Sequence, residues 1–106
     1  MLLVSNFSLQ MLPLEKYHLK FQTVSTEEAA KMIEWKDTLS CIGNSYVAKA
    51  MSDILDIYIP IHPISVAQVE WEDMLVWSYC GDRLTRENVG LKIPETAYRW
   101  VFITLF

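Results

Sequence analysis

The sequence predicts an α/β (mixed α+β) fold, in which helices pack on one mixed, mostly antiparallel sheet of about five strands. Two observations support this prediction. Alternating, β-branched and aromatic segments occur near both ends of the chain, and two segments of its first half repeat apolar residues at helical spacing. The predicted order is strand, strand, helix, short strand, helix and then three strands, with no internal repeat.

The first three elements are predicted from local patterns. Residues 2–7 are rich in β-forming residues, and in residues 18–24 apolar and polar side chains alternate. Both segments should be strands, the second of them half-buried. Ser25 and Glu28 then form a capping-box pattern, so a short helix with an apolar stripe should follow and continue through Trp35.

A second helix is predicted in the middle of the chain. Residues 39–42 form a brief apolar run that is typical of a short strand. Apolar side chains then recur at helical spacing over residues 45–55, which predicts a stronger helix than the first. We expect Pro60 and Pro63 to end this helix, because proline cannot continue the hydrogen-bond ladder.

The last third of the chain is predicted to be β-structure. Residues 64–71 and 74–80 flank a short acidic turn, which favours a β-hairpin. Residues 81–94 are polar and should form a loop. Residues 98–106 are β-branched and aromatic enough to form a terminal strand.

The size and composition of the chain are those of one globular domain, residues 1–106. With 52% hydrophobic and 21% charged residues, and only 3 Gly and 4 Pro, a disordered or low-complexity chain is excluded. The 4 Trp, 5 Tyr and 4 Phe exceed the needs of a small core. We therefore expect part of the aromatic surface to contact a partner.

The charge pattern excludes several classes of partner. The formal net charge is −4, and no basic cluster is present, so we expect no binding to long nucleic acid. No signal peptide or membrane-spanning segment is recognisable, which predicts a soluble cytoplasmic protein without membrane contact.

Cys41 and Cys80 have no metal-binding spacing and are expected to be buried thiols in a reducing compartment. We expect neither a metal nor a cofactor.

Residues 41–45, Cys-Ile-Gly-Asn-Ser, contain the most chemical information. Gly43 would let the backbone approach a ligand closely. Asn44 or Ser45 can cap the second helix, and the free N–H groups of its first turn would form an anion site. The segment is therefore either a cradle for a phosphate or nucleotide, or an ordinary capped turn.

Arg83 and His62 are two further candidates. Arg83 follows the predicted hairpin and could donate paired hydrogen bonds to a phosphate at the sheet edge. The alternative is a solvated loop charge that pairs with Asp82 or Glu87. His62 could act as a general base, although nothing in the sequence places a nucleophile or an orienting carboxylate beside it.

Three segments resemble a known family in their order and spacing. They are residues 2–12, which begin Leu-Leu-Val-Ser-Asn-Phe-Ser, residues 40–45, Ser-Cys-Ile-Gly-Asn-Ser, and residues 76–84, from Val-Trp-Ser to Arg-Leu. In these segments the chain is similar to the small archaeal-virus and phage proteins that include the viral ring nucleases, which are anti-CRISPR proteins acting against type III systems.

The resemblance implies a homodimer that binds a cyclic oligoadenylate, typically cyclic tetra-adenylate, in a pocket spanning the dimer interface. Family members cut this second messenger without a metal ion, so that a defence nuclease is not activated. The ligand-binding residues implied in this sequence are Asn6, Ser8, Gln10, Gly43, Asn44, Ser45, Tyr46 and Arg83.

The sequence departs from the family at the catalytic position. In the family, Ser-x-Ile-Gly is normally followed by the histidine that acts as catalytic acid, and here that position is Asn44. Tyr46 and Val47 occupy the positions of a small Ser-Thr pair, and Arg86 falls where an acidic residue is often found. Asparagine cannot exchange a proton near neutral pH, so acid catalysis would be lost while binding need not be.

Three functions remain open on the sequence alone. The first is a viral sponge, a homodimer that sequesters a cyclic nucleotide without destroying it; Tyr46 could then stack on a base. The second is a ring nuclease that uses other residues, such as His62 or Arg83. The third is an inhibitor of a host complex that acts through its aromatic surface and binds no ligand.

Overall fold

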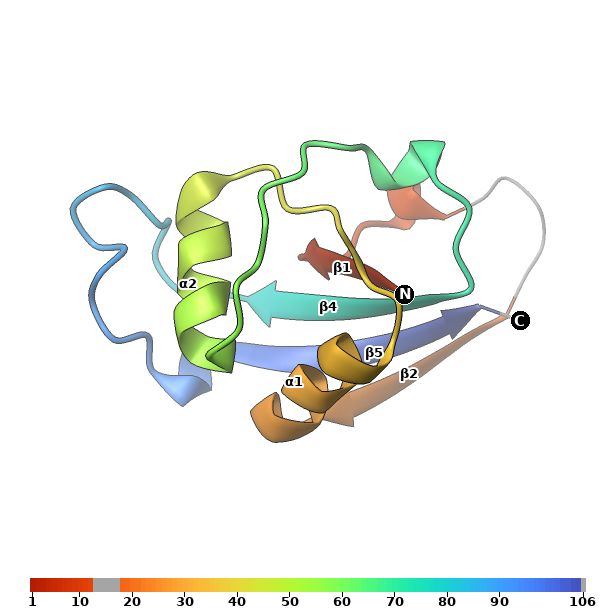
Figure 1. The fold of residues 1–106 in the computed structure, drawn as a ribbon, viewed down its shortest axis with the longest axis horizontal. Helices are drawn as coiled ribbons and strands as arrows, with labels where there is room; N and C mark the ends of the chain where they lie inside the picture. Colours follow the sequence, from red (N-terminus) through yellow and green to blue (C-terminus); the bar gives the residue numbers. More distant parts are fainter. Residues whose placement is uncertain (13–17, 106) are drawn as a thin grey trace.

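The computed structural model describes residues 1–12 and 18–105, which contain one five-stranded sheet (Figure 1). Across the sheet, the strands lie in the order β2-β5-β4-β1-β3. Their bounds are β1 (Leu2–Ser5), β2 (Leu19–Val24), β3 (Leu39–Ser40), β4 (Asp73–Tyr79) and β5 (Tyr98–Leu105). Each corresponds to a predicted strand with slightly different ends, and residue 106 lies outside the described residues. The predicted mixed α+β fold is confirmed.

The sheet has one antiparallel and one parallel half. β5 pairs antiparallel with β2 and with β4, whereas β1 pairs parallel with β4 and with β3. In the centre, Val4 lies opposite Val76 and Ser5 opposite Trp77. Because β1, β3 and β4 run in the same direction, their carboxyl ends meet at one edge of the sheet.

The two helices, α1 (Thr26–Trp35) and α2 (Ser45–Leu55), lie on the same face of the sheet (Figure 1). α1 begins as predicted: Glu28 N donates to Ser25 Oγ at 3.1 Å, and Ser25 N donates to Glu28 Oε1 at 3.4 Å. The prediction that Pro60 and Pro63 end α2 is wrong. The helix ends at Asp56, which has left-handed backbone angles (φ 55°, ψ 39°) that stop helical hydrogen bonding before residue 60 is reached.

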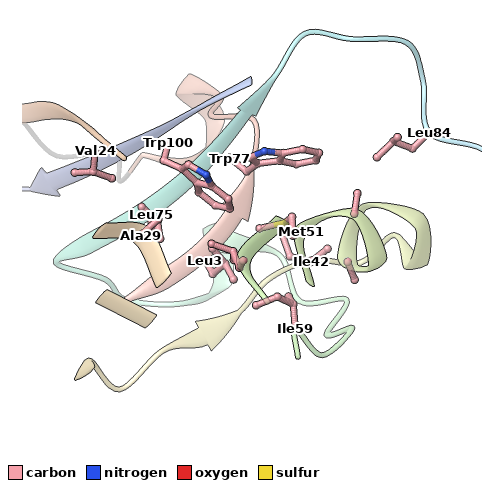
Figure 2. Packing of buried hydrophobic residues seen from close by; sticks show 13 residues of the cluster. Leu3, Val24, Ala29, Ile42, Met51, Ile59, Leu75, Trp77, Leu84 and Trp100 are labelled. Carbon is pink, nitrogen blue, oxygen red and sulfur yellow. The ribbon is translucent and has the colours of Figure 1, made fainter. Parts of the chain in front are cut away.

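Buried apolar side chains cover both faces of the sheet. On the helix face, Leu3, Leu75, Trp77 and Trp100 pack against side chains of α1 and α2, including Met51 (Figure 2). On the opposite face, the core consists of Leu2, Val4, Val66, Met74, Val76 and Ile103. Each fully buried large apolar side chain contributes about 1.5–3 kcal/mol to the free energy of unfolding, so the central strands anchor the fold.

The predicted β-hairpin is absent, which corrects the sequence interpretation. Residues 64–71 contain a short 3₁₀ helix, η2 (Val66–Gln68), which lies against another, η1 (Leu9–Met11), on the face opposite the helices. The physical reason is that both edges of β4 are already paired, one with β1 and the other with β5. The apolar run therefore packs on the face of the sheet instead of joining it.

Two predictions of burial are also wrong. β2 is not half-buried along its length: residues 20–23 are exposed and Val24 is buried, because β2 is an edge strand that the helices cover only at its end. Cys80 is exposed, since it lies just beyond the end of β4, whereas Cys41 is half-buried. Burial raises the pKa of the Cys41 thiol.

Candidate functional site

The candidate site is the edge of the sheet where β1, β3 and β4 end. The chain leaves β1 at Asn6, leaves β3 towards the start of α2, and leaves β4 into the loop at residues 80–97 (Figure 1). Carboxyl ends of parallel strands are where α/β sheets commonly bind ligands, because loops and helix N-termini converge there. Most of the residues predicted from the sequence lie on these three exits.

Asn6 ties the ends of β1 and β4 together. Its backbone N–H donates to Trp77 O at 3.0 Å, and its side-chain Oδ1 accepts from Tyr79 N at 2.9 Å. The residue has φ 54°, a left-handed conformation that asparagine tolerates better than most residues. The side chain thus continues the strand pairing for one more residue, and its carbonyl oxygen is engaged by the fold.

Asn44 caps α2 and occupies two amides that a ligand could otherwise use. Its Oδ1 accepts from Tyr46 N at 2.8 Å and from Val47 N at 3.2 Å. The expected anion site of free first-turn amides is therefore partly filled by the protein itself. Within residues 1–12 and 18–105, no hydrogen bond reaches Asn44 Nδ2, so this group can donate to a ligand.

The residues beside Asn44 differ in exposure. Gly43 and Ser45 are exposed, while Tyr46 is half-buried and packs against the helix-face core. A Cβ at residue 43 would meet Pro63 at an ordinary 3.6 Å, so packing does not require glycine there. Tyr46 therefore offers part of its ring to solvent while the rest anchors the first turn of α2.

Arg83 lies on the loop that follows β4. Its side chain is exposed, whereas the next residue, Leu84, is buried in the core cluster next to α2 (Figure 2). In the described parts of the chain, no carboxylate forms an ion pair with Arg83; the expected alternative pairing with Asp82 or Glu87 is not formed. The guanidinium group is therefore available to an anion.

Ser8 and Gln10 are separated from these residues. Ser8 Oγ accepts from Gln10 N at 3.3 Å and so caps η1. η1 packs with η2 on the face of the sheet opposite α2. The structure therefore gives Ser8 a local structural role and brings neither residue into contact with Asn44 within one copy of the chain.

Tyr79 is a site residue that the sequence analysis did not single out. Its ring stacks on Trp77 with 4.8 Å between centroids, and its hydroxyl donates to Asp82 O. Burial, and then the charges of Asp82 and Cys80, raise the pKa of Tyr79. The only local signal for this role is a tyrosine two residues before a glycine, Gly81, where a Cβ would lie 2.5 Å from the tyrosine oxygen.

His62 covers the outer edge of β3. Its backbone N–H donates to Ile42 O at 2.8 Å, and its ring Nδ1 lies 3.0 Å from Ser40 O. Ser40 Oγ in turn donates to Pro60 O at 2.7 Å. A carbonyl oxygen only accepts, so Nδ1 carries a proton and Nε2 is the acceptor of the neutral ring.

Comparison with known proteins assigns the chain to a family. A sequence model of the STIV B116-like family matches residues 1–98. The chain belongs to this family. B116 of Sulfolobus turreted icosahedral virus (STIV) has a similar solved structure, with a TM-score of 0.76, 12% sequence identity and coverage of 97% of each chain. No curated protein is similar in sequence.

These comparisons confirm the expected kinship with archaeal-virus proteins, and the structural match shows that the STIV B116-like fold is shared. No helix in residues 1–12 and 18–105 is both long and apolar enough to cross a membrane. The same residues contain no group of three or more His, Cys, Asp or Glu side chains that could hold a metal ion.

Proposed function

We propose that this STIV B116-like protein is a viral anti-defence protein that acts as a sponge. It binds a cyclic oligonucleotide second messenger, a cyclic oligoadenylate or a related signal, in a pocket between the two subunits of a homodimer. It acts in the host cytoplasm and retains the messenger without cutting it. The observation that carries the proposal is Asn44, a residue with no acid function that caps α2 at the edge where three parallel strands end.

The chemistry of Asn44 supports binding without cleavage. An asparagine amide cannot protonate the leaving 5'-oxygen of a phosphodiester, and loss of a general acid costs about 10² to 10⁴ in rate. Its Oδ1 is committed to the helix, as the hydrogen bonds to Tyr46 and Val47 show. Its Nδ2 can donate to a phosphate oxygen or to a base nitrogen.

The charges around the site support an anionic ligand. Arg83 is exposed, and α2 has no acidic side chain in its first turn, so the positive end of the helix dipole is not neutralised from within. A guanidinium group gives paired, charge-assisted hydrogen bonds to phosphate. The overall charge of −4 disfavours a long polyanion but not a small ligand held by such local groups.

The test is to identify what the protein holds and what it releases. Purified protein is incubated with a panel of cyclic nucleotides that includes cyclic tetra-adenylate, separated from free ligand and denatured, and the ligand is analysed by mass spectrometry. We expect one panel member to be recovered intact. Recovery of linear product would overturn the sponge.

A ring nuclease is the second candidate, and the ring of His62 favours it. With its Nδ1–H directed to Ser40 O, the neutral ring has a basic nitrogen, Nε2, that can accept a proton. Linear product that persists after exhaustive purification and disappears in His62→Ala would establish this function. A panel that leaves the melting temperature unchanged would instead favour an inhibitor acting through exposed aromatics such as Trp35 and Tyr58.

A further inference from the structure

One side chain, that of Asn88, organises the part of the loop that carries Arg83. Asn88 Oδ1 accepts from Thr85 N at 2.7 Å, and Asn88 Nδ2 donates to Arg83 O at 2.9 Å. The backbone N–H of Asn88 also donates to Thr85 O at 3.3 Å. Three hydrogen bonds therefore connect Asn88 to the residues before and after Leu84, which are Arg83 and Thr85.

Leu84 fixes the same segment by packing its side chain into the core. Its side chain is buried in the helix-face core (Figure 2), while Arg83 before it is exposed. The backbone between residues 83 and 85 is thus held by packing on one side and by the Asn88 amide on the other. Only a side chain with both an acceptor and a donor can make the two Asn88 side-chain bonds at once.

We infer that Asn88 is a positioning residue for anion binding by Arg83, an inference that rests on the proposed function. By fixing the backbone at Arg83 before the ligand arrives, Asn88 lowers the entropic cost of ordering the loop on binding. Asn88 acts on the ligand through Arg83 rather than by touching it. Removing Asn88 should therefore matter only while Arg83 is present.

A double-mutant cycle tests this dependence. Binding of cyclic tetra-adenylate is measured by calorimetric titration for the wild type, Arg83→Ala, Asn88→Ala and the double variant. We expect Arg83→Ala to weaken binding by about 10- to 100-fold and Asn88→Ala by about 3- to 10-fold. The double variant should bind no more weakly than Arg83→Ala alone, because the two residues act as one unit.

Arg86 provides a matched control. It is an exposed arginine of the same loop, and within the described residues the Asn88 side chain makes no hydrogen bond to it. Arg86→Ala should therefore weaken binding less than Arg83→Ala, because neither hydrogen bond of the Asn88 side chain ends at Arg86. Asn88→Asp is a second variant, which keeps the acceptor for Thr85 N, loses the donor to Arg83 O and adds a negative charge, so it should weaken binding at least as much as Asn88→Ala.

A measurement without ligand separates failure of this inference from failure of the proposed function. Hydrogen exchange of the Thr85 amide should be faster in Asn88→Ala than in the wild type, while circular dichroism confirms that the variant is folded. Equal exchange, unchanged affinity in Asn88→Ala, or a full additive loss in the double variant would overturn the inference and leave the sponge intact. A wild-type protein that binds no member of the nucleotide panel would overturn both.

Discussion

Asn44 combines a structural role and a proposed binding role in one side chain. Its oxygen caps α2, and its amide nitrogen makes no hydrogen bond within residues 1–12 and 18–105. The sequence predicts a cap at Asn44 or Ser45, because both residue types are strong N-terminal signals before an apolar helical repeat, and the structure shows Asn44 in this role. The cap occupies the backbone amides of Tyr46 and Val47, so fewer donors of the first turn remain for an anion.

Variants of Asn44 separate the two roles. Asn44→Ala should lower the free energy of unfolding by about 0.5–2 kcal/mol, because two first-turn amides lose their acceptor. Asn44→Asp keeps the acceptor and adds a charge that the helix dipole favours, so its stability should equal or exceed that of the wild type. Its affinity for an anionic ligand should nevertheless fall. Urea unfolding measures the stability of each variant, and ligand titration measures its affinity. A lower stability of Asn44→Asp than of the wild type would contradict the capping role of Asn44.

Other predicted site residues show how far sequence reasoning extends at this scale. Gly43, Asn44, Ser45 and Tyr46 stay together because they are consecutive in the chain. Ser8 and Gln10 are only a few residues from the end of β1, yet η1 places them on the opposite face of the sheet. No local sequence pattern predicts that η1 lies on the face opposite the helices, because this placement depends on which surface the apolar side chains around η1 cover.

At the scale of elements, the end of β4 determines the start of the loop that carries Arg83. Trp77 and Tyr79 stack, and the Tyr79 ring lies against Gly81, where no side chain fits without displacing it. The tyrosine hydroxyl then holds the backbone at Asp82. The strand therefore fixes where the loop begins.

Gly81→Ala should disturb this arrangement. A methyl group would lie 2.5 Å from the Tyr79 oxygen, so the ring must leave either its stack on Trp77 or its hydrogen bond to Asp82 O. We expect the free energy of unfolding to fall by about 1–3 kcal/mol.

Gly90→Ala is the control, and thermal unfolding measures the stability of both variants. A Cβ at residue 90 meets nothing within 4 Å, and the glycine has no positive φ. The substitution should therefore be neutral or stabilise the protein by about 0.4–1 kcal/mol. Equal stability of the Gly81 and Gly90 variants would show that the Tyr79 contact does not constrain the loop.

The two outer strands of the sheet, β3 and β2, differ in whether another segment of the chain covers them. Residues 60–62 bond to the outer edge of β3 through Pro60 O and His62, whereas residues 20–23 of β2, at the other edge, are exposed. The candidate site lies at the ends of β1, β3 and β4, on the parallel half of the sheet. The proposed pocket between two copies would therefore form around this half, on the side of the sheet away from β2.

Native mass spectrometry tests the dimer and the ligand together. We expect a species of two chains with one cyclic nucleotide bound, because the proposed pocket spans the interface and needs both copies. Arg83→Ala should remain a dimer and lose the ligand peak at the same nucleotide concentration. One ligand on each single chain would contradict a shared pocket, even though it would leave binding itself in place.

Local sequence signals are enough to predict the elements that depend on neighbouring residues. The capping box of α1, a cap of α2 at Asn44 or Ser45, and the apolar repeat of each helix depend on residues a few positions apart. The folded chain is needed to see the strand order, the absence of a hairpin at residues 64–71 and the contacts that Asn88 makes at Arg83. The physical reason is that each of these depends on competition between distant segments for the same edge, face or backbone group.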